Sequence, residues 1–581
     1  MRLEPGRLWA APALVLVLGP TAAGLAGTVL PAFGWLPAIG REDLSLDPWR
    51  ELWATPGLGR AVLLSLASGL GSTLLALALA LAIAAVLHGR PGERLWRALL
   101  PVLLAVPHAA AAVGFAFLVA PSGFLARLAA PLLGLERPPD LATVQDPWAL
   151  SLTLALALRE TPFLLFAILA TADRPGLDHR LAAARSLGRS RVAAWLEVAL
   201  PALWPSLRLP VVAVLAYGLS AVDMALVLGP TAPPPLAVLV LRWMMDPDLD
   251  RRLVGSAAAL LLLGLTLGLV LLGRLVETAL RRPFRAPPAL VIATTACGRA
   301  AAGIVPAAAL AGLALLLAWS FASSWRFPAL FPSGPDLGAW RAALPLLGPV
   351  AMATALLALA SLALALPATI AALEAPGRGR ATALLWLPLL LPQVGFVFGL
   401  QVLFVRLDLA ERAAGLVLAH LVMVLPYLWL MLRGPWMRFD PRLRAAARCL
   451  GCGPVATVRK VVLPVLFRPI LAAAAIGFSV SVAQYLLTLA VGGGRFPTLA
   501  TETMALVAGG DRRRIGVAAL LLAVLPLLAT ALASLLPERA GRPVPADGPR
   551  LPQLVGSGAK RFSMSSSVKL SPAPPPPSTP S

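Results

Sequence analysis

Long apolar blocks alternate with short polar segments along almost the whole chain. Each block has about 20 residues or more, enough for a helix to cross the hydrocarbon core of a bilayer. Pro and Gly are frequent within the blocks, which membrane helices tolerate better than soluble helices do. We predict an all-α membrane protein with about twelve transmembrane helices, at about residues 8–30, 60–87, 98–120, 148–172, 206–228, 254–275, 301–321, 345–373, 383–405, 413–432, 466–490 and 515–536.

The charges in the connecting segments indicate the orientation of these helices. Segments on the same side as the N-terminus carry a large excess of Arg, whereas the segments on the other side carry balanced charge. Because Lys and Arg are retained on the cytoplasmic side, we expect both termini in the cytoplasm. The apolar run at about 8–30 exceeds the core of a signal peptide, so we interpret it as a retained first helix.

Composition agrees with a membrane protein and argues against several other classes. Of the 581 residues, 59% are hydrophobic and 13% are charged, too little charge to cover a soluble surface. The net charge of +22 is spread over short segments without a basic face, so nucleic-acid binding is not expected. Cys297, Cys449 and Cys452 provide neither a disulfide framework nor a set of zinc ligands. We expect no catalytic residues, no cofactor and no metal site.

The two halves of the chain contain the same cytoplasmic segment. After the fourth block the chain reads LAAARSLGRSRVAAWLEVALP, and after the tenth it reads LRAAARCLGCGPVATVRKVVLP. Gly451 and Pro464 lie 263 residues after Gly188 and Pro201, so one element is present twice in one register. An even number of helices in each half makes the halves parallel repeats, related by an axis along the membrane normal.

This repeat sets the domain boundaries that we expect. The C-terminal segment is rich in Pro and Ser, cannot bury a core, and is predicted to be disordered. The expected segments are a first six-helix repeat at 1–280 with its loop at 178–201, a cytoplasmic linker at 281–300, a second repeat at 301–537 with its loop at 440–464, and the tail at 538–581.

The duplicated loop has the residue types of a docking element. Its Ala-rich stretch favours a compact helix, its Gly allows the backbone to turn, and its Pro can begin the next membrane helix. Arginines around the turn offer charge to a partner protein. An ordinary amphipathic loop is the alternative, but it gives no reason for two copies at identical spacing.

Both loops resemble the EAA loop, EAA-x3-G with a downstream Leu-Pro, of bacterial binding-protein-dependent ABC importer permeases. Two permease halves in one chain resemble the ferric-iron and thiamine importer permeases and their relatives, over about 8–536. The resemblance implies a type I importer permease fold in the inner membrane, two ATP-binding cassette ATPase subunits, and a periplasmic or tethered solute-binding protein. The residues that it implies for coupling to the ATPase are Ala182, Arg185, Gly188, Pro201, Ala445, Arg448, Gly451 and Pro464.

The sequence departs from that family at the Glu of the EAA motif. Ala182 and Ala445 occupy this position, which removes one charged contact to the ATPase. The chain has no Gly-Lys-Ser/Thr of a Walker A loop, so ATP hydrolysis is expected on a separate subunit. The main alternative is a twelve-helix secondary transporter driven by an ion gradient. Ferric iron and thiamine-like compounds are suggested as solutes by the resemblance alone.

Charged residues inside the blocks are candidates for the solute path, because ionisable groups within a bilayer are costly. Arg159 and Glu160 lie in the middle of the fourth block, and Asp223 lies towards the outer end of the fifth. Gln484 and Tyr485 lie near the equivalent depth in the second half. An Arg159–Asp223 pair with a structural role is equally compatible with the sequence.

Overall fold

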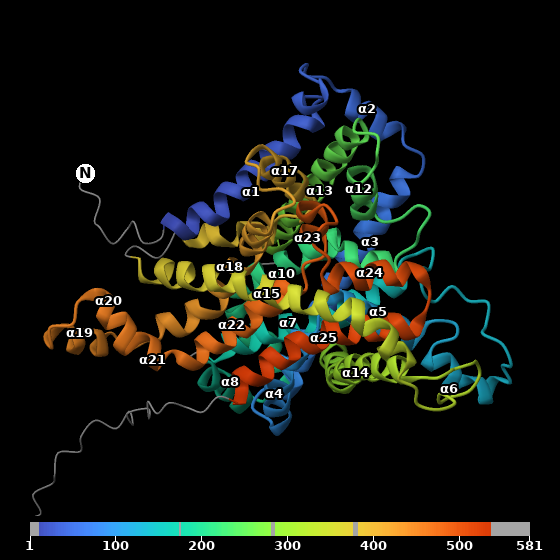
Figure 1. Ribbon diagram of the computed structural model, residues 1–581. Coiled ribbons are helices and arrows are strands. Elements are labelled where there is room, and N and C mark those ends of the chain that lie inside the picture. The colour runs from blue at the N-terminus through green and yellow to red at the C-terminus, as the bar shows by residue number, and fades with distance from the viewer. Residues whose placement is uncertain (1–10, 174–175, 280–284, 376–381, 536–581) are drawn as a thin grey trace, which may run out of the picture. The chain divides into compact units, whose positions relative to one another are not determined.

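The computed structural model describes residues 11–173, 176–279, 285–375 and 382–535, and these are mostly helical (Figure 1). Within these ranges no β-strand is formed, and two isolated β-bridges close short loops. The predicted all-α class is confirmed. The helices of the first half are α1 (Ala11–Ala32), α2 (Asp47–Ala54), α3 (Leu58–Leu87), α4 (Pro91–Ala105), α5 (His108–Val119), α6 (Phe124–Leu133), α7 (Leu150–Ala172), α8 (Leu177–Ser186), α9 (Arg191–Ala194), α10 (Leu200–Ser220), α11 (Val222–Leu228), α12 (Leu236–Met244) and α13 (Arg251–Ala279).

The second half repeats this pattern of long and short helices. Both halves contain a π-helical turn before a Leu-Pro, at Trp195–Ala199 and at Val458–Val462. The helices of the second half are α14 (Pro288–Phe321), α15 (Gly338–Glu374), α16 (Leu387–Leu390), α17 (Val394–Arg406), α18 (Ala413–Met437), α19 (Pro441–Cys449), α20 (Pro454–Thr457), α21 (Leu463–Val465), α22 (Phe467–Val482), α23 (Leu486–Gly492), α24 (Leu499–Gly509) and α25 (Arg512–Leu535), with a 3-10 turn η4 (Thr382–Trp386) before α16.

In the described part of the chain, ten helices are long and apolar enough to cross a membrane, and there are up to twelve spans if each of two bent pairs counts as one. The bent pairs are Leu384–Leu390 with Val394–Arg406, at 110°, and Pro454–Val465 with Phe467–Val482, at 82°. The prediction of about twelve spans therefore agrees with the structure. The block expected at 98–120 is divided between α4 and α5.

The segment expected as a linker at 281–300 is largely helical, because α14 begins at Pro288. Pro at the first helical positions is pre-organised for a helix start, and the extended backbone of Pro287 leads into it. Residues 280–284 and the predicted tail at 538–581 lie outside the described residues.

The first long helix of each half packs against the other half. α1 contacts α17, and α14 contacts α3 and α5. A Cβ built at Gly27 would lie 2.7 Å from the Cα of Gly399, and one built at Gly114 would lie 3.0 Å from that of Gly312. Small residues let membrane helices approach this closely. Gly312 lies 285 residues after Gly27, and Gly399 lies 285 residues after Gly114. The two contacts therefore join equivalent positions, and each half gives its first long helix to the other.

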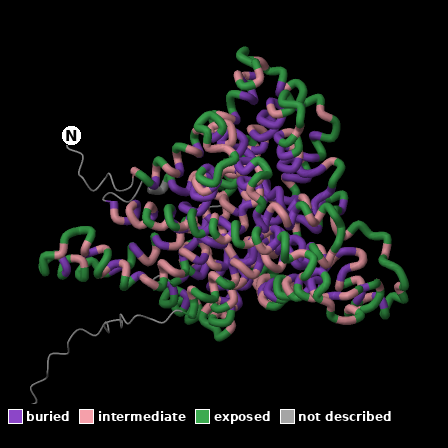
Figure 2. Tube along the Cα trace, in the orientation of Figure 1, coloured by how far each residue is buried: buried purple, intermediate pink, exposed green. Residues whose placement is uncertain are grey.

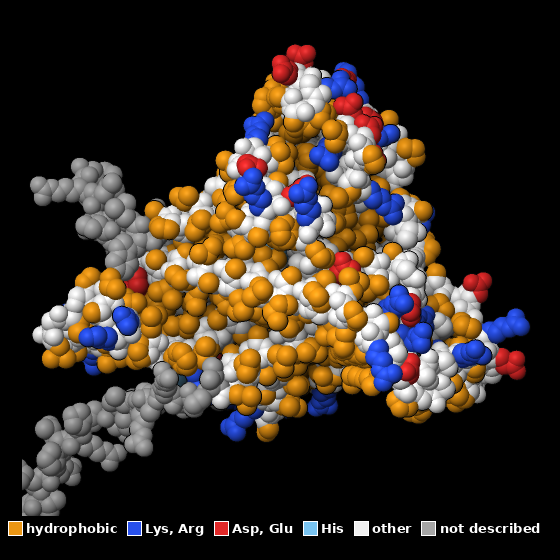
Figure 3. Space-filling model, in the orientation of Figure 1, with side chains coloured by type: hydrophobic (Ala, Val, Ile, Leu, Met, Phe, Trp, Pro, Cys, Tyr) orange, Lys and Arg blue, Asp and Glu red, His pale blue; other side chains and the backbone are white. Residues whose placement is uncertain are grey.

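The surface of the described residues suits a lipid environment. Buried residues concentrate where the helices pack against one another, whereas the turn between α19 and α20 is mostly exposed (Figure 2). Hydrophobic side chains cover much of the face seen in Figure 3, and charged side chains gather mainly towards the ends of the helices. Leucines such as Leu271 and Leu356 are exposed on long helices, as expected where lipid provides the surrounding solvent.

Thiol labelling tests the expected orientation, because Cys449 is exposed within the second loop. A membrane-impermeant maleimide added to intact spheroplasts should leave Cys297, Cys449 and Cys452 unlabelled. The same reagent added to inverted vesicles should label Cys449. Labelling of any of the three cysteines from outside intact spheroplasts would contradict the expected orientation.

Candidate functional site

A cavity of about 170 Å³ lies between helices of the two halves. Its wall is formed by α4, α5, α7, α10 and α11 of the first half and by η4, α16, α18, α22 and α23 of the second. One water molecule needs about 10–15 Å³ of such space, so the cavity can hold several waters or a small solute.

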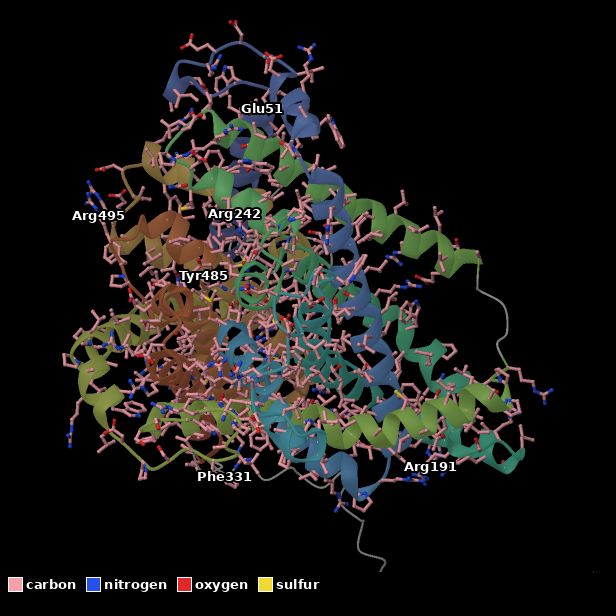
Figure 4. All side chains as sticks on the ribbon, turned by 90° about the vertical axis from the view of Figure 1, so that its right-hand side faces the viewer. Glu51, Arg191, Arg242, Phe331, Tyr485 and Arg495 are labelled. Atoms are coloured by element: carbon pink, nitrogen blue, oxygen red, sulfur yellow. The ribbon has the colours of Figure 1, made fainter. Side chains whose placement is uncertain are left out.

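The cavity brings together all five residues that the sequence singled out within the membrane. Arg159, Glu160 and Asp223 provide the charges, and all three come from the first half. Gln484 and Tyr485 come from the second half, in the segment between α22 and α23. In Figure 4, Tyr485 lies among the helices, whereas Glu51 and Arg191 lie towards the periphery.

A break between α4 and α5 determines the position of Arg159. Pro107 has no N–H and an extended backbone, so the last carbonyl groups of α4 lack helical partners. The guanidinium of Arg159 donates to two of them, with Nη2 at 2.9 Å from the oxygen of Val106 and 3.3 Å from that of Leu104. Arg159 therefore stabilises the broken helix from the wall of the cavity.

Glu160 has a partner that the sequence did not reveal. Nε2 of His108, the first residue of α5, lies 2.9 Å from Oε1 of Glu160. Glu160 is buried, with 7% of its surface exposed. The ring of His108 packs on that of Tyr217, with centroids 4.4 Å apart. A lone His within an apolar block usually has a packing role, so in the sequence only its place directly after Pro107 distinguishes it.

Asp223 lies at a second helix break, between α10 and α11. Its Oδ1 accepts a hydrogen bond from the hydroxyl of Tyr217 at 3.1 Å and one from the backbone N–H of Met224 at 2.9 Å. Within the described residues no Arg, Lys or His forms an ion pair with it. The Arg159–Asp223 pair that the sequence left open is therefore not formed, because Arg159 is bound to the end of α4.

The two loops at 178–201 and 440–464 fold into the same turn. Gly188 and Gly451 have φ values of +82° and +79°, which favour glycine, and each follows the last turn of a short helix. The backbone N–H of Gly188 donates to the carbonyl of Arg185, and that of Gly451 donates to the carbonyl of Arg448, both at 3.0 Å. Pro201 and Pro464 follow the π-helical turns at the start of the next helix.

The apex of each loop exposes a leucine. Leu187 is 83% exposed and Leu450 is 84% exposed, each immediately before the turn glycine. Ala182, Arg185, Ala445 and Arg448 are also exposed on the same short helices, α8 and α19. The sequence identified the glycines and arginines, but it gave no reason to select the leucines.

The loops differ in their attachment to the rest of the protein. The first loop is held by buried side chains such as Trp195, and by the contact of Arg189 with Glu197, which raises the pKa of Arg189 through a hydrogen bond. The second loop extends further out at the left of Figure 1. It is held by Arg444, whose guanidinium makes two hydrogen bonds of 2.6 and 2.7 Å to Glu374 at the end of α15.

Comparison with known proteins identifies the family. Over 535 residues the chain is 33% identical to the inner membrane ABC transporter permease protein YnjC of Escherichia coli strain K12, and the match covers 91% of this chain and 97% of that protein. The chain belongs to the ABC transporter permeases. The permease is also 24% identical over 163 residues to the spermidine/putrescine transport system permease protein PotC of Haemophilus influenzae, which covers 28% of the permease and 63% of PotC. No family model matches.

This membership defines the role of the permease. It is the membrane-spanning transport subunit of an ABC importer in the bacterial inner membrane, and ABC permeases work with ATPase and solute-binding partners. A twelve-helix secondary transporter is not favoured. The names of the two relatives specify neither ferric iron nor a thiamine-like compound.

Proposed function

We propose that the permease docks two ATPase subunits, one on each of the loops 178–201 and 440–464, and receives solute from a periplasmic or tethered binding protein. The duplicated turn carries this proposal, because two equal docking elements in one chain suit two copies of one partner. ATP is hydrolysed on the partner subunits, and the permease itself catalyses no reaction. Both of its termini lie in the cytoplasm.

The exposed leucines supply the apolar part of the docking surface. Leu187 and Leu450 protrude at equivalent places of the two loops, where each would enter an apolar pocket of a partner subunit. Ala182 and Ala445 replace the Glu of the EAA motif. The exposed charges closest in sequence to the leucines on α8 and α19 are those of Arg185 and Arg448. We therefore expect an apolar pocket with nearby carboxylates on each ATPase.

The path from loop to cavity supports alternating access. In the first half, Arg191–Ser220 runs as one apolar helical span from the loop to the break beside Asp223. In the second half, α22 ends at the segment that carries Gln484 and Tyr485. Movement of a loop by the ATPase would therefore displace one wall of the cavity. The π-helical turns at equivalent places provide local points of adjustment.

Reconstitution with the ATPase and the binding protein distinguishes this function from the alternative. In proteoliposomes, solute uptake should require ATP and the binding protein, and it should persist when protonophores or ionophores remove ion gradients. Uptake that follows an imposed ion gradient without ATP would contradict the proposal. A permease inserted without partners should give no accumulation.

A further inference from the structure

We propose that the solute carries a positively charged organic nitrogen, which binds beside Asp223 among the aromatic rings of the cavity. The inference rests on the proposed role of the cavity as the solute path, and it adds the chemical class of the solute. It follows from a negative charge without a protein counter-charge, from the kinds of side chain around it, and from the small number of metal-binding groups.

Asp223 is a buried carboxylate without a cationic partner in the described part of the chain. Asp223 is 9% exposed, and its described hydrogen bonds come from the hydroxyl of Tyr217 and the N–H of Met224. Two neutral donors orient a carboxylate but leave its charge uncompensated. Because an ionised carboxylate in a low-dielectric interior is costly without a counter-charge, a cation entering the cavity would stabilise it.

The other charged groups of the cavity are already engaged. Glu160 is bonded to His108, and Arg159 donates to the carbonyl groups at the end of α4. The ionisable groups that line the cavity are His108, Arg159, Glu160, Asp223, Tyr217, Tyr427 and Tyr485. Asp223 is therefore the one carboxylate of this group without a basic partner among the described residues.

The tyrosines of the protein are concentrated in this cavity. The whole chain contains three tyrosines, and Tyr217, Tyr427 and Tyr485 all line the cavity. Phe163 and Trp386 add two further rings. Aromatic faces attract organic cations through their quadrupoles, and such rings recognise quaternary ammonium ligands.

A metal cation fits the same wall poorly. Among the described residues there is no group of three or more His, Cys, Asp and Glu side chains that could hold a metal ion. Hard metal ions require several oxygen ligands, and transition metals require a compact set of nitrogen, oxygen or sulfur ligands. An organic cation needs only one carboxylate and apolar or aromatic surroundings, which this cavity provides.

Binding of choline to the purified full-length permease tests the proposal without any ATPase. By isothermal titration calorimetry, choline should bind more tightly than 3,3-dimethylbutan-1-ol, its neutral isostere. Asp223→Asn should weaken choline binding about tenfold or more, equivalent to about 1.4 kcal/mol, and leave the affinity for the alcohol unchanged. Asp223→Glu, which keeps the charge, should retain choline binding.

Asp250→Asn is the matched control, because Asp250 is an exposed carboxylate that does not line the cavity, and this variant should bind choline normally. Three outcomes would overturn the proposal: no choline binding by the wild type, equal affinity for choline and the alcohol, or unchanged choline affinity in a monodisperse Asp223→Asn protein. Tighter binding of ferric citrate than of choline would also overturn it, in favour of a metal. None of these outcomes affects the ATP requirement of transport, so the cationic solute can be disproved while the proposed ATP-driven import still stands.

Discussion

Replacement of Gly188 or Gly451 with Val is expected to uncouple ATP hydrolysis from solute uptake while the permease remains folded in the membrane. Both glycines have positive φ, a conformation that costs a β-branched residue about 1–3 kcal/mol. No atom lies within 4 Å of a Cβ built at either position, so the strain is confined to the turn. A strain of about 1.4 kcal/mol lowers the population of the native turn about tenfold. Solute imported per ATP hydrolysed, measured in proteoliposomes, should fall by about the same factor.

Gly453→Val is the control for this prediction. Gly453 lies two residues after Gly451, has a φ of −64° and has equally open surroundings, so Val fits there without the same strain. Coupling in this variant should stay close to that of the wild type. Normal coupling in the Gly188 and Gly451 variants, or an equal loss in all three, would show that the shape of the turn does not transmit the signal.

The sequence predicted the turn of each duplicated loop because the constraint on it is local. A positive φ favours a residue without Cβ, so Gly188 and Gly451 were visible as a repeated spacing, and the structure shows a positive φ at both. The exposure of Leu187 and Leu450 depends instead on how each short helix lies on the rest of the protein. No local pattern distinguishes such a leucine from one that faces lipid.

The sequence predicted part of the cavity, because charge inside an apolar block is itself a signal. It did not predict the pairing, because the partner of Arg159 is created by the break at Pro107. Proline alone does not predict such a break, since α15 continues through Pro345, Pro349 and Pro367. His108, Tyr217 and Tyr427 were missed because a ring within an apolar block usually packs in the interior. Their role beside the charges required three-dimensional contacts.

The packing of α1 and α14 against the opposite halves could also be recognised only in the structure. Gly27 and Gly312 are ordinary small residues in apolar helices when only the sequence is considered. Their equivalent contacts with Gly399 and Gly114 appear only when the two halves are packed together. The reciprocal contact then explains why the halves form one unit around a shared cavity.

The mass of the purified transporter, measured by native mass spectrometry after co-expression with its ATPase, tests most directly whether each loop docks one ATPase subunit. The wild type should contain one permease and two ATPases. Because each leucine protrudes at one apex, Leu187→Asp and Leu450→Asp should each lose one ATPase, and the double variant should lose both. Leu44→Asp, which alters an exposed leucine of the α1–α2 connection, should keep two. A wild-type complex with a single ATPase, or a double variant that retains two, would contradict docking through the duplicated loops.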